Sequence, residues 1–223
     1  MGFLRASRLV APAAALAAAA ALAACGGGDD ASTSATSAQG DCRQVEAPAP
    51  KSEHFRKPGQ VLKPGAPAKA TVETSCGAFT IELDTKRSPE TSNSFAFLAD
   101  KGFYDGTVFH RIAPGFVIQG GDPKGDGTGG PGYTVVEAPP QNTVYRNGLV
   151  AMAKTQVEPP GASGSQFFVV TAPADAGLPP DYAVLGKVTE GMDVVDAIGK
   201  LGDPATEQPT QTITIDKVTV EPG

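Results

Sequence analysis

The abundance of turn-forming residues is the feature that most constrains how this chain can fold. Its 223 residues include 27 glycines and 20 prolines, which together exceed a fifth of the sequence. Both residue types weaken or interrupt helices, so this density argues against a helical bundle and favours many short strands joined by turns. Because 40% of the residues are hydrophobic, such strands can enclose a packed core.

Hydrophobic spacing indicates where the secondary structure lies. Ala70–Thr74 and Ala78–Asp84 flank a Cys-Gly pair and predict a hairpin. A helix is expected to start at Ser88-Pro89, where the serine can cap it and the proline suits its first turn, and to end at Gly102. The remaining expected elements are strands at Thr107–Ile112, Phe116–Gln119, Tyr133–Val136, Leu149–Ala153, Gln166–Thr171, Ala183–Val188 and Thr212–Val220, and a second helix at Met192–Leu201. This pattern predicts a mainly β fold, a closed sheet whose ends are covered by the helices.

Residues 1–25 have the organisation of an export signal. Arg5 and Arg8 precede an apolar run, Leu9–Ala24, that is too short to span a bilayer comfortably. The run ends in Leu22-Ala23-Ala24-Cys25, which resembles the lipobox of bacterial lipoproteins, where the cysteine receives a diacylglycerol and becomes the new N-terminus. We therefore expect Cys25 to be lipidated and the protein to be anchored extracytoplasmically at the cell membrane. An ordinary signal peptide with an incidental cysteine is the alternative.

The segments that follow predict three further parts of the chain. Residues 26–41 lack large apolar side chains and are expected to form a disordered tether. Residues 42–69 are expected to be an irregular extension, and residues 70–221 the folded domain. Export would place Cys42 and Cys76 in an oxidising compartment, where we expect them to form a disulfide that contributes roughly 4 kcal/mol. Two free thiols are the alternative.

Charge and composition exclude several other functions. The net charge is −6, and without Arg5 and Arg8 it becomes −8, with 16 basic and 24 acidic residues. The sequence shows no basic stripe with interleaved aromatic residues, so nucleic-acid binding has little support. The cysteine spacings fit no zinc pattern, and only His54 and His110 could supply imidazole ligands. We expect neither a metal nor a cofactor, and a monomer is the default.

Two segments carry the most specific motifs of the chain. Val108–Asp122 reads VFHRIAPGFVIQGGD and Gly164–Val169 reads GSQFFV. They resemble the F-H-R-x-x-x-x-F-x-x-Q-G-G-D and G-S-Q-F-F signatures of the cyclophilins, a family of peptidyl-prolyl cis/trans isomerases. The similarity runs from about Ala70 to Val220. It implies a closed eight-stranded antiparallel barrel capped by two α-helices, with an open groove on its outer face.

The resemblance also implies roles for individual residues. Arg111 matches the catalytic arginine, and we count Phe116 and Gln119 with it as catalytic. The expected substrate-binding residues are Val117, Gly127, Ala153, Lys154, Thr155, Gln166, Phe168, Leu178 and Tyr182. Because the chain has no tryptophan, and Ala176-Gly177 stand where many members carry one, strong inhibition by cyclosporin is not expected.

The chemistry of prolyl isomerisation is consistent with these roles. Rotation about a peptide bond costs about 18–20 kcal/mol because it breaks the C–N resonance. In the twisted state the prolyl nitrogen regains a lone pair, to which a fixed guanidinium can donate a hydrogen bond more strongly than to the planar amide. One such bond contributes about 1.5–3 kcal/mol. An apolar pocket that grips the ring must supply the rest of the roughly 5–6 kcal/mol needed for a 10⁴-fold acceleration.

Side-chain alternation predicts which aromatic residues form the core. Adjacent strand residues face opposite sides of a sheet, so Phe109 and Phe167 are expected in the core while Phe116 and Phe168 face the groove. His110 is expected to serve the structure rather than the chemistry. We therefore predict an isomerase that acts on proline-containing polypeptides and accelerates the folding of exported proteins at the cell envelope. A proline-peptide binding module, or a holdase chaperone with little turnover, is the alternative.

Overall fold

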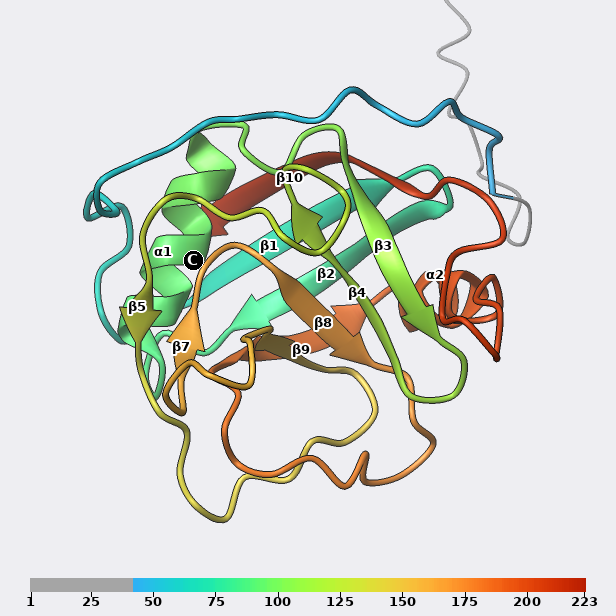
Figure 1. The fold of residues 1–223 in the computed structure, drawn as a ribbon. Helices are drawn as coiled ribbons and strands as arrows, with labels where there is room; N and C mark the ends of the chain where they lie inside the picture. The colour runs from blue at the N-terminus through green and yellow to red at the C-terminus, as the bar shows by residue number, and fades with distance from the viewer. Residues whose placement is uncertain (1–41) are drawn as a thin grey trace, which may run out of the picture. The chain divides into compact units, whose positions relative to one another are not determined.

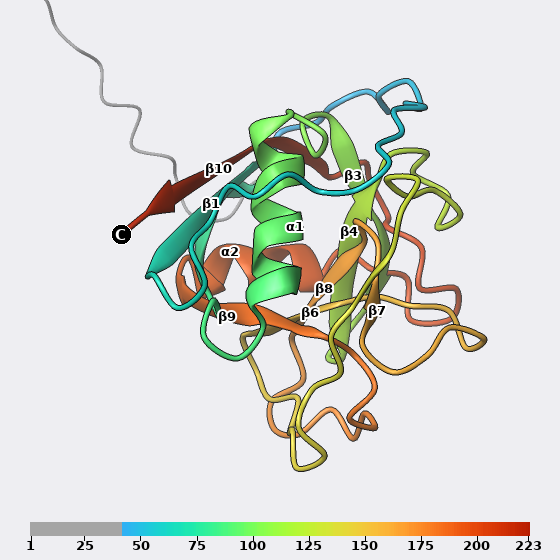
Figure 2. The ribbon, with the colours of Figure 1, turned by 90° about the vertical axis from the view of Figure 1, so that its left-hand side faces the viewer.

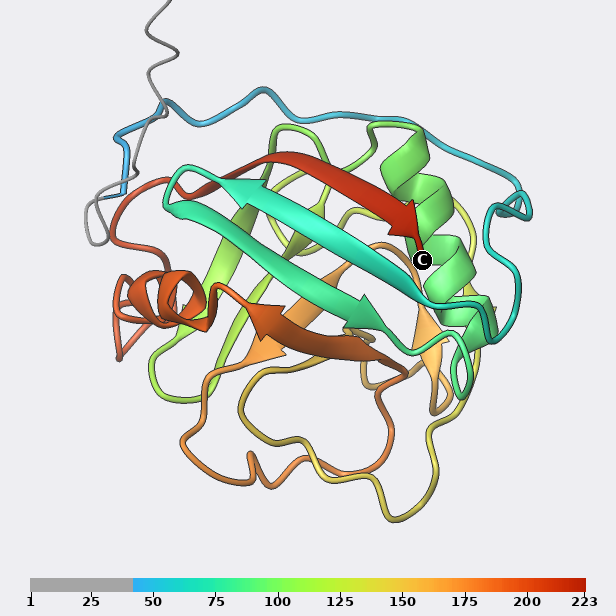
Figure 3. The same ribbon diagram turned by 180° about the vertical axis from the view of Figure 1, so that it is seen from behind.

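The computed structural model describes residues 42–223, and these fold around a closed β-barrel. Each barrel strand pairs antiparallel with its neighbours in the order β1-β10-β3-β4-β8-β6-β9-β2 (Figures 1 and 3). The strands are β1 (Ala68–Thr74), β2 (Gly77–Leu83), β3 (Thr107–Ala113), β4 (Val117–Asp122), β6 (Leu149–Met152), β8 (Phe167–Val170), β9 (Val184–Glu190) and β10 (Thr214–Pro222). The predicted fold class is confirmed. The expected signal peptide, Cys25 and the tether lie outside the described residues.

Most expected strands are present, with small shifts at their ends. β4 starts one residue after the expected Phe116 and continues to Asp122, and β10 runs from Thr214 to Pro222. The expected strand at Tyr133–Val136 is reduced to β5 (Val135–Val136). β5 pairs outside the barrel with β7 (Ala162–Ser163), which is too short to leave a periodic signal in the sequence.

Two helices lie at opposite ends of the barrel, as Figures 1 and 2 show. α1 spans Pro89–Asp100 and α2 spans Met192–Gly199, so α2 is shorter than expected. The side chain of Ser88 does not cap α1 as predicted. Instead the Glu137 carboxylate accepts hydrogen bonds from the first-turn amides of Glu90 (3.3 Å) and Thr91 (2.9 Å). Within residues 42–223 no helix is long and apolar enough to cross a membrane.

Residues 42–67, called the strap below, contain no helix or strand and run over the surface of the domain (Figure 1). The extension therefore ends two residues earlier than predicted, because Ala68 already belongs to β1. A disulfide joins Cys42 to Cys76 in the turn between β1 and β2, which confirms the predicted pair. Beside it, Arg43 forms an ion pair of 2.6 Å with Asp216 in β10.

The strap covers the outer side of α1 (Figure 2). The ring of Phe55 packs edge-on against Phe97, with 5.3 Å between the ring centroids. The Asn93 side chain binds the strap through four hydrogen bonds: its oxygen accepts from the amides of Val61 (2.8 Å) and Leu62 (3.0 Å) and from the side chain of Gln60 (3.2 Å), while its nitrogen donates to the Gly59 carbonyl (2.9 Å). With the barrel on one side and the strap on the other, every residue from Thr91 to Ala99 is buried.

Asn93 is therefore expected to contribute strongly to stability. Asn93→Ala would leave the strap amides without an acceptor, so we expect the free energy of unfolding to fall by about 2–3 kcal/mol. Hydrogen exchange at Val61 and Leu62 should accelerate in the same variant. Ser92→Ala is the matched control, because the buried Ser92 hydroxyl has no hydrogen-bond partner among the described residues. Equal denaturation midpoints for Asn93→Ala and the wild type would contradict this role.

Candidate active site

Alternation along β4 and β8 divides the apolar side chains between the two sides of the barrel wall. Ile118 and Phe167 belong to the barrel core, whereas their neighbours Val117 and Phe168 belong to a second cluster on the outer side. Phe109 is also fully buried in the core. Because successive strand residues face opposite sides, the same two strands supply both the core and an outer apolar surface. The expected assignment of Phe109 and Phe167 is confirmed.

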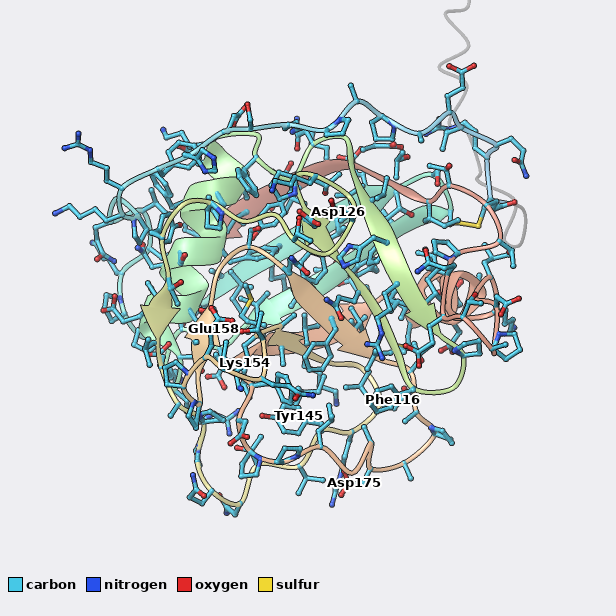
Figure 4. The ribbon with its side chains drawn as sticks, viewed as in Figure 1. Phe116, Asp126, Tyr145, Lys154, Glu158 and Asp175 are labelled. Carbon is cyan, nitrogen blue, oxygen red and sulfur yellow. A yellow bond between two sulfur atoms is a disulfide. The ribbon has the colours of Figure 1, made fainter. Side chains whose placement is uncertain are left out.

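The outer cluster, called the apolar patch below, is built on β3, β4, β6 and β8 and on the loops beside them. Its buried residues are Ala113, Val117, Tyr145, Ala151, Phe168, Val170 and Ala172. The side chains packed around these are partly exposed and include Phe116, Ala153, Leu178 and Tyr182. In Figure 4 Phe116 and Lys154 lie on either side of this region, with Tyr145 between them. The structure thus brings together the apolar residues that the sequence predicted for the site.

Tyr145 is a member of the patch that the sequence analysis missed. Its ring lies tilted against Phe168 (6.4 Å between centroids) and edge-to-face with Tyr182 (6.0 Å). Its hydroxyl donates to the Tyr182 carbonyl (2.7 Å) and accepts from the Tyr182 amide (3.0 Å). Burial raises the pKa of Tyr145 to about 12, so the hydroxyl stays protonated and can keep the bond to the carbonyl. Tyr145 therefore fixes the chain at Tyr182 against the patch.

Arg111 extends over the edge of this patch. The strand registers place Arg111 (β3) opposite Gln119 (β4), and Gln119 opposite Phe168 (β8). The guanidinium carbon lies 6.0 Å from the centroid of the Phe116 ring, within the range of a cation–π contact. Its Nε donates to the carboxylate of Glu207 at 2.6 Å. A positive, directional donor thus borders a half-buried apolar surface.

A chain of side-chain amides connects Arg111 to a nearby loop. Gln166 donates through its nitrogen to the carbonyls of Gly127 (3.0 Å) and Gly129 (2.9 Å). Its oxygen must then accept, and it does so from Gln119 at 3.1 Å. The Gln119 oxygen is thereby left to face Arg111, whose Nη1 lies 3.4 Å away. The backbone carbonyls therefore determine which end of each amide faces the arginine.

A polar cleft of about 650 Å³ adjoins the apolar patch beyond Gln119 and Gln166. Lys154, Thr155 and Glu158 line one side of this cleft. The Lys154 ammonium donates to the carbonyls of Thr155 and Glu158, each at 3.1 Å, and lies 5.8 Å from the ring centroid of Tyr182. The Ala153 amide is already used, because it donates to the Gln166 carbonyl at 2.8 Å. Patch and cleft together could hold a chain that extends to either side of a proline.

His110 lies behind the amide chain, with its Nε2 3.5 Å from the Gln119 nitrogen. Burial lowers the pKa of His110 from its ordinary value, the Arg111 charge adds to the lowering, and the buried Asp122 carboxylate opposes it. Asp122 itself accepts hydrogen bonds from the amides of Lys124, Asp126 and Gly127, and so shapes the loop that carries Gly127. Within residues 42–223, no three His, Cys, Asp or Glu side chains are grouped to hold a metal.

The geometry agrees with comparisons to known proteins. Residues 69–220 match the family model described as cyclophilin type peptidyl-prolyl cis-trans isomerase/CLD. The chain belongs to the cyclophilin family. This cyclophilin is 39% identical over 171 residues to peptidyl-prolyl cis-trans isomerase B of Streptomyces anulatus, covering 68% of this chain and 95% of that protein. It is also 39% identical over 155 residues to peptidyl-prolyl cis-trans isomerase-like 1 of Neurospora crassa, covering 67% and 91% respectively.

Solved structures give the same result. A Cryptosporidium parvum cyclophilin aligns with a TM-score of 0.64 at 28% identity, covering 70% of this chain and 99% of the other. The same protein, crystallised in the presence of the dipeptide Ala-Pro, aligns with a TM-score of 0.63 at 29% identity and the same coverage. The chain is a peptidyl-prolyl cis-trans isomerase, as its sequence predicted. The strap, together with Ala68 of β1, lies outside the matched family region.

The lowered pKa of His110 predicts a pH dependence of stability. The unfolded chain, with an ordinary histidine pKa near 6.5, takes up a proton before the folded chain does. The stability that neutral His110 contributes is therefore present above that pH and is lost as pH falls through the pKa of His110 in the folded chain. Denaturant melts between pH 7.5 and 5 should show a smaller loss for His110→Gln than for the wild type. His54→Gln, at an exposed position, is the control, and identical slopes for His110→Gln and the wild type would contradict the assignment.

Proposed function

We propose that this cyclophilin isomerises X-Pro bonds in proteins that fold outside the cytoplasm, with Arg111 as the catalytic group and a lipid on Cys25 as its anchor. The observation that carries the catalytic part is the placement of Arg111 at the edge of the apolar patch. Its guanidinium lies 6.0 Å from the Phe116 ring centroid and is two strands away from Phe168. Adjacent strands lie about 4.8 Å apart, so a prolyl ring on Phe168 is within reach of the arginine side chain.

The proposed mechanism uses binding energy and one directional donor. The proline ring packs on the patch, where Phe168 and Val117 form the floor and Phe116 and Leu178 flank it. Arg111 donates a hydrogen bond to the prolyl nitrogen once the amide has twisted and its lone pair has formed. This interaction is absent from the planar ground state, so it lowers the barrier rather than only increasing affinity. Proline-containing polypeptides are the substrates, and the Ala-Pro dipeptide used with the Cryptosporidium protein supports this class.

The amide chain supports this role through preorganisation. The carbonyls of Gly127 and Gly129 orient Gln166, which orients Gln119, which in turn faces Arg111. Donors that are fixed before the reaction need no rearrangement as the lone pair develops. In this proposal Gln119 and Gln166 also present polar groups to the substrate backbone. Lys154 and Thr155 bind the residues before proline, with the cleft beyond them open to a longer chain.

Replacement of Arg111 tests the catalytic role. We expect Arg111→Ala to lower kcat/KM in a protease-coupled assay on an X-Pro peptide by about a hundredfold, the size of one charge-assisted hydrogen bond. The denaturation midpoint should change little, because the side chain is partly exposed. Arg87→Ala is the control, since Arg87 pairs with Asp84 on the exposed surface. Rates for Arg111→Ala equal to the wild type would refute the role, and peptide binding by a wild type without rate enhancement would favour a binding module.

Lipidation is tested by metabolic labelling of the full-length chain in a bacterial host. We expect radiolabelled palmitate to be incorporated into the wild type, which should partition into the detergent phase. Cys25→Ser should lose both properties, because only this cysteine follows the Leu-Ala-Ala sequence. Cys42→Ser, which breaks the disulfide but leaves that motif intact, should keep the label. A wild type without label would exclude the lipid anchor.

A further inference from the structure

Glu207 contacts the proposed catalytic arginine from a loop that the sequence motifs do not include. The Nε of Arg111 donates to its carboxylate at 2.6 Å, across a sequence separation of 96 residues. This side chain and a glutamine hold the guanidinium from two sides, since Nη1 approaches Gln119 at 3.4 Å. These two hydrogen bonds use Nε and Nη1, and neither of them uses the other terminal nitrogen, Nη2.

The backbone at Glu207 is held in an unfavourable conformation. Its φ is 57°, and it is the one non-glycine residue of the described chain with a positive φ. A glutamate in the left-handed region is strained, and such strain persists only where the surroundings impose it. Here Asp203 imposes it, because its side chain accepts from the amides of Ala205 (2.9 Å) and Thr206 (2.8 Å) and its carbonyl accepts from the Glu207 amide (2.8 Å).

The same loop is fixed to the strand that carries the arginine. The amide of Ile112, the residue after Arg111 in β3, donates to the Glu207 carbonyl at 2.9 Å. Gly202, at the start of the loop, lies so close to Ile112 that a Cβ at this position would collide with the Ile112 carbonyl. The carboxylate of Glu207 is therefore set at a fixed place relative to the backbone of Arg111.

Folding stability does not account for the side-chain contact between Glu207 and Arg111. The side chains of Arg111 and Glu207 are 35% and 43% exposed, and ion pairs with this exposure add little to folding stability. The backbone hydrogen bonds of Glu207 hold its loop to β3, but the side-chain contact with Arg111 contributes little to the fold. Strain of this kind gathers at functional sites, where it holds a group in place before the reaction.

We propose that Glu207 is a positioning residue for catalysis, which fixes the Arg111 guanidinium through Nε, while Gln119 receives Nη1, so that Nη2 stays directed at the prolyl nitrogen. The inference rests on the proposed catalytic role of Arg111. Glu207 touches the arginine and not the substrate. Loss of Glu207 should lower kcat rather than raise KM, because the apolar patch proposed to bind the proline ring does not include Glu207.

The test compares two variants of Glu207 in the full chain. Glu207→Ala removes the acceptor, and we expect kcat/KM to fall about tenfold with KM unchanged. Glu207→Gln keeps an oxygen that can accept from Nε, and it should recover most of the lost activity. Asp216→Ala is the matched control, because Asp216 forms an ion pair of the same 2.6 Å with Arg43 in the strap. That control should retain wild-type kcat.

A double-mutant cycle separates positioning from a general structural effect. In an Arg111→Ala background, Glu207→Ala should not lower kcat/KM any further, because there is no guanidinium left to orient. An added tenfold loss in that background would show an effect independent of Arg111 and overturn the inference. Wild-type rates for Glu207→Ala, together with impaired Arg111→Ala, would overturn the positioning role and leave the proposed function intact. Wild-type rates for Arg111→Ala would overturn both.

A spectroscopic measurement gives a readout besides activity. The Nε–H proton of Arg111, assigned by its loss in Arg111→Lys, should exchange slowly with water in the wild type because it is hydrogen-bonded. In Glu207→Ala the exchange should approach that of an exposed arginine, whereas Asp216→Ala should leave it unchanged. Equal exchange in the wild type and Glu207→Ala would show that the contact does not hold the guanidinium.

Discussion

The alternation of side chains along a closed antiparallel sheet is the constraint on which the rest of this structure depends. Each residue that enters the barrel core requires its neighbour to face outward, so Phe167 inside implies Phe168 outside, and Ile118 implies Val117. The apolar patch is therefore a by-product of core packing, and in the proposed mechanism it becomes the surface that binds the proline ring. A shift of one residue in the register of β8 would exchange the two faces and remove both.

The polar part of the site is built differently, from contacts between segments far apart in the chain. A loop shaped by the buried Asp122 carboxylate presents two carbonyls, and the orientation they impose passes through two glutamine side chains to Arg111. A second loop, shaped by Asp203, delivers Glu207 to the other side of the guanidinium. Carboxylates in loops thus hold these segments in place, and in the proposed mechanism they leave the arginine available to substrate. This division suits a reaction that makes and breaks no bond to the enzyme.

Short-range periodicity predicted the hairpin and a closed sheet, whereas the eight-stranded barrel and the grouping of Phe116, Phe168 and Arg111 came from the resemblance of two motifs to the cyclophilins. Helix capping by Glu137 could not be predicted, since the capping carboxylate and the helix are 46 residues apart. Glu207 is missed for a similar reason, because it lies 96 residues from its partner and its loop has no apolar periodicity. Tyr145 sits in a stretch rich in turn residues and is assigned to the patch only by its three-dimensional contacts with Phe168 and Tyr182.

The disulfide at the start of the strap has a mechanical consequence. Whatever precedes Cys42 is joined to the folded body by a covalent bond at the turn between β1 and β2, before the weaker contacts of the strap begin. In the strand order, β1 and β2 lie across the barrel from β4 and β8, which carry the patch. Tension in the preceding chain would be transmitted to the turn between β1 and β2, on the side of the barrel opposite the patch. The strap's hydrogen bonds to α1 would not carry that tension.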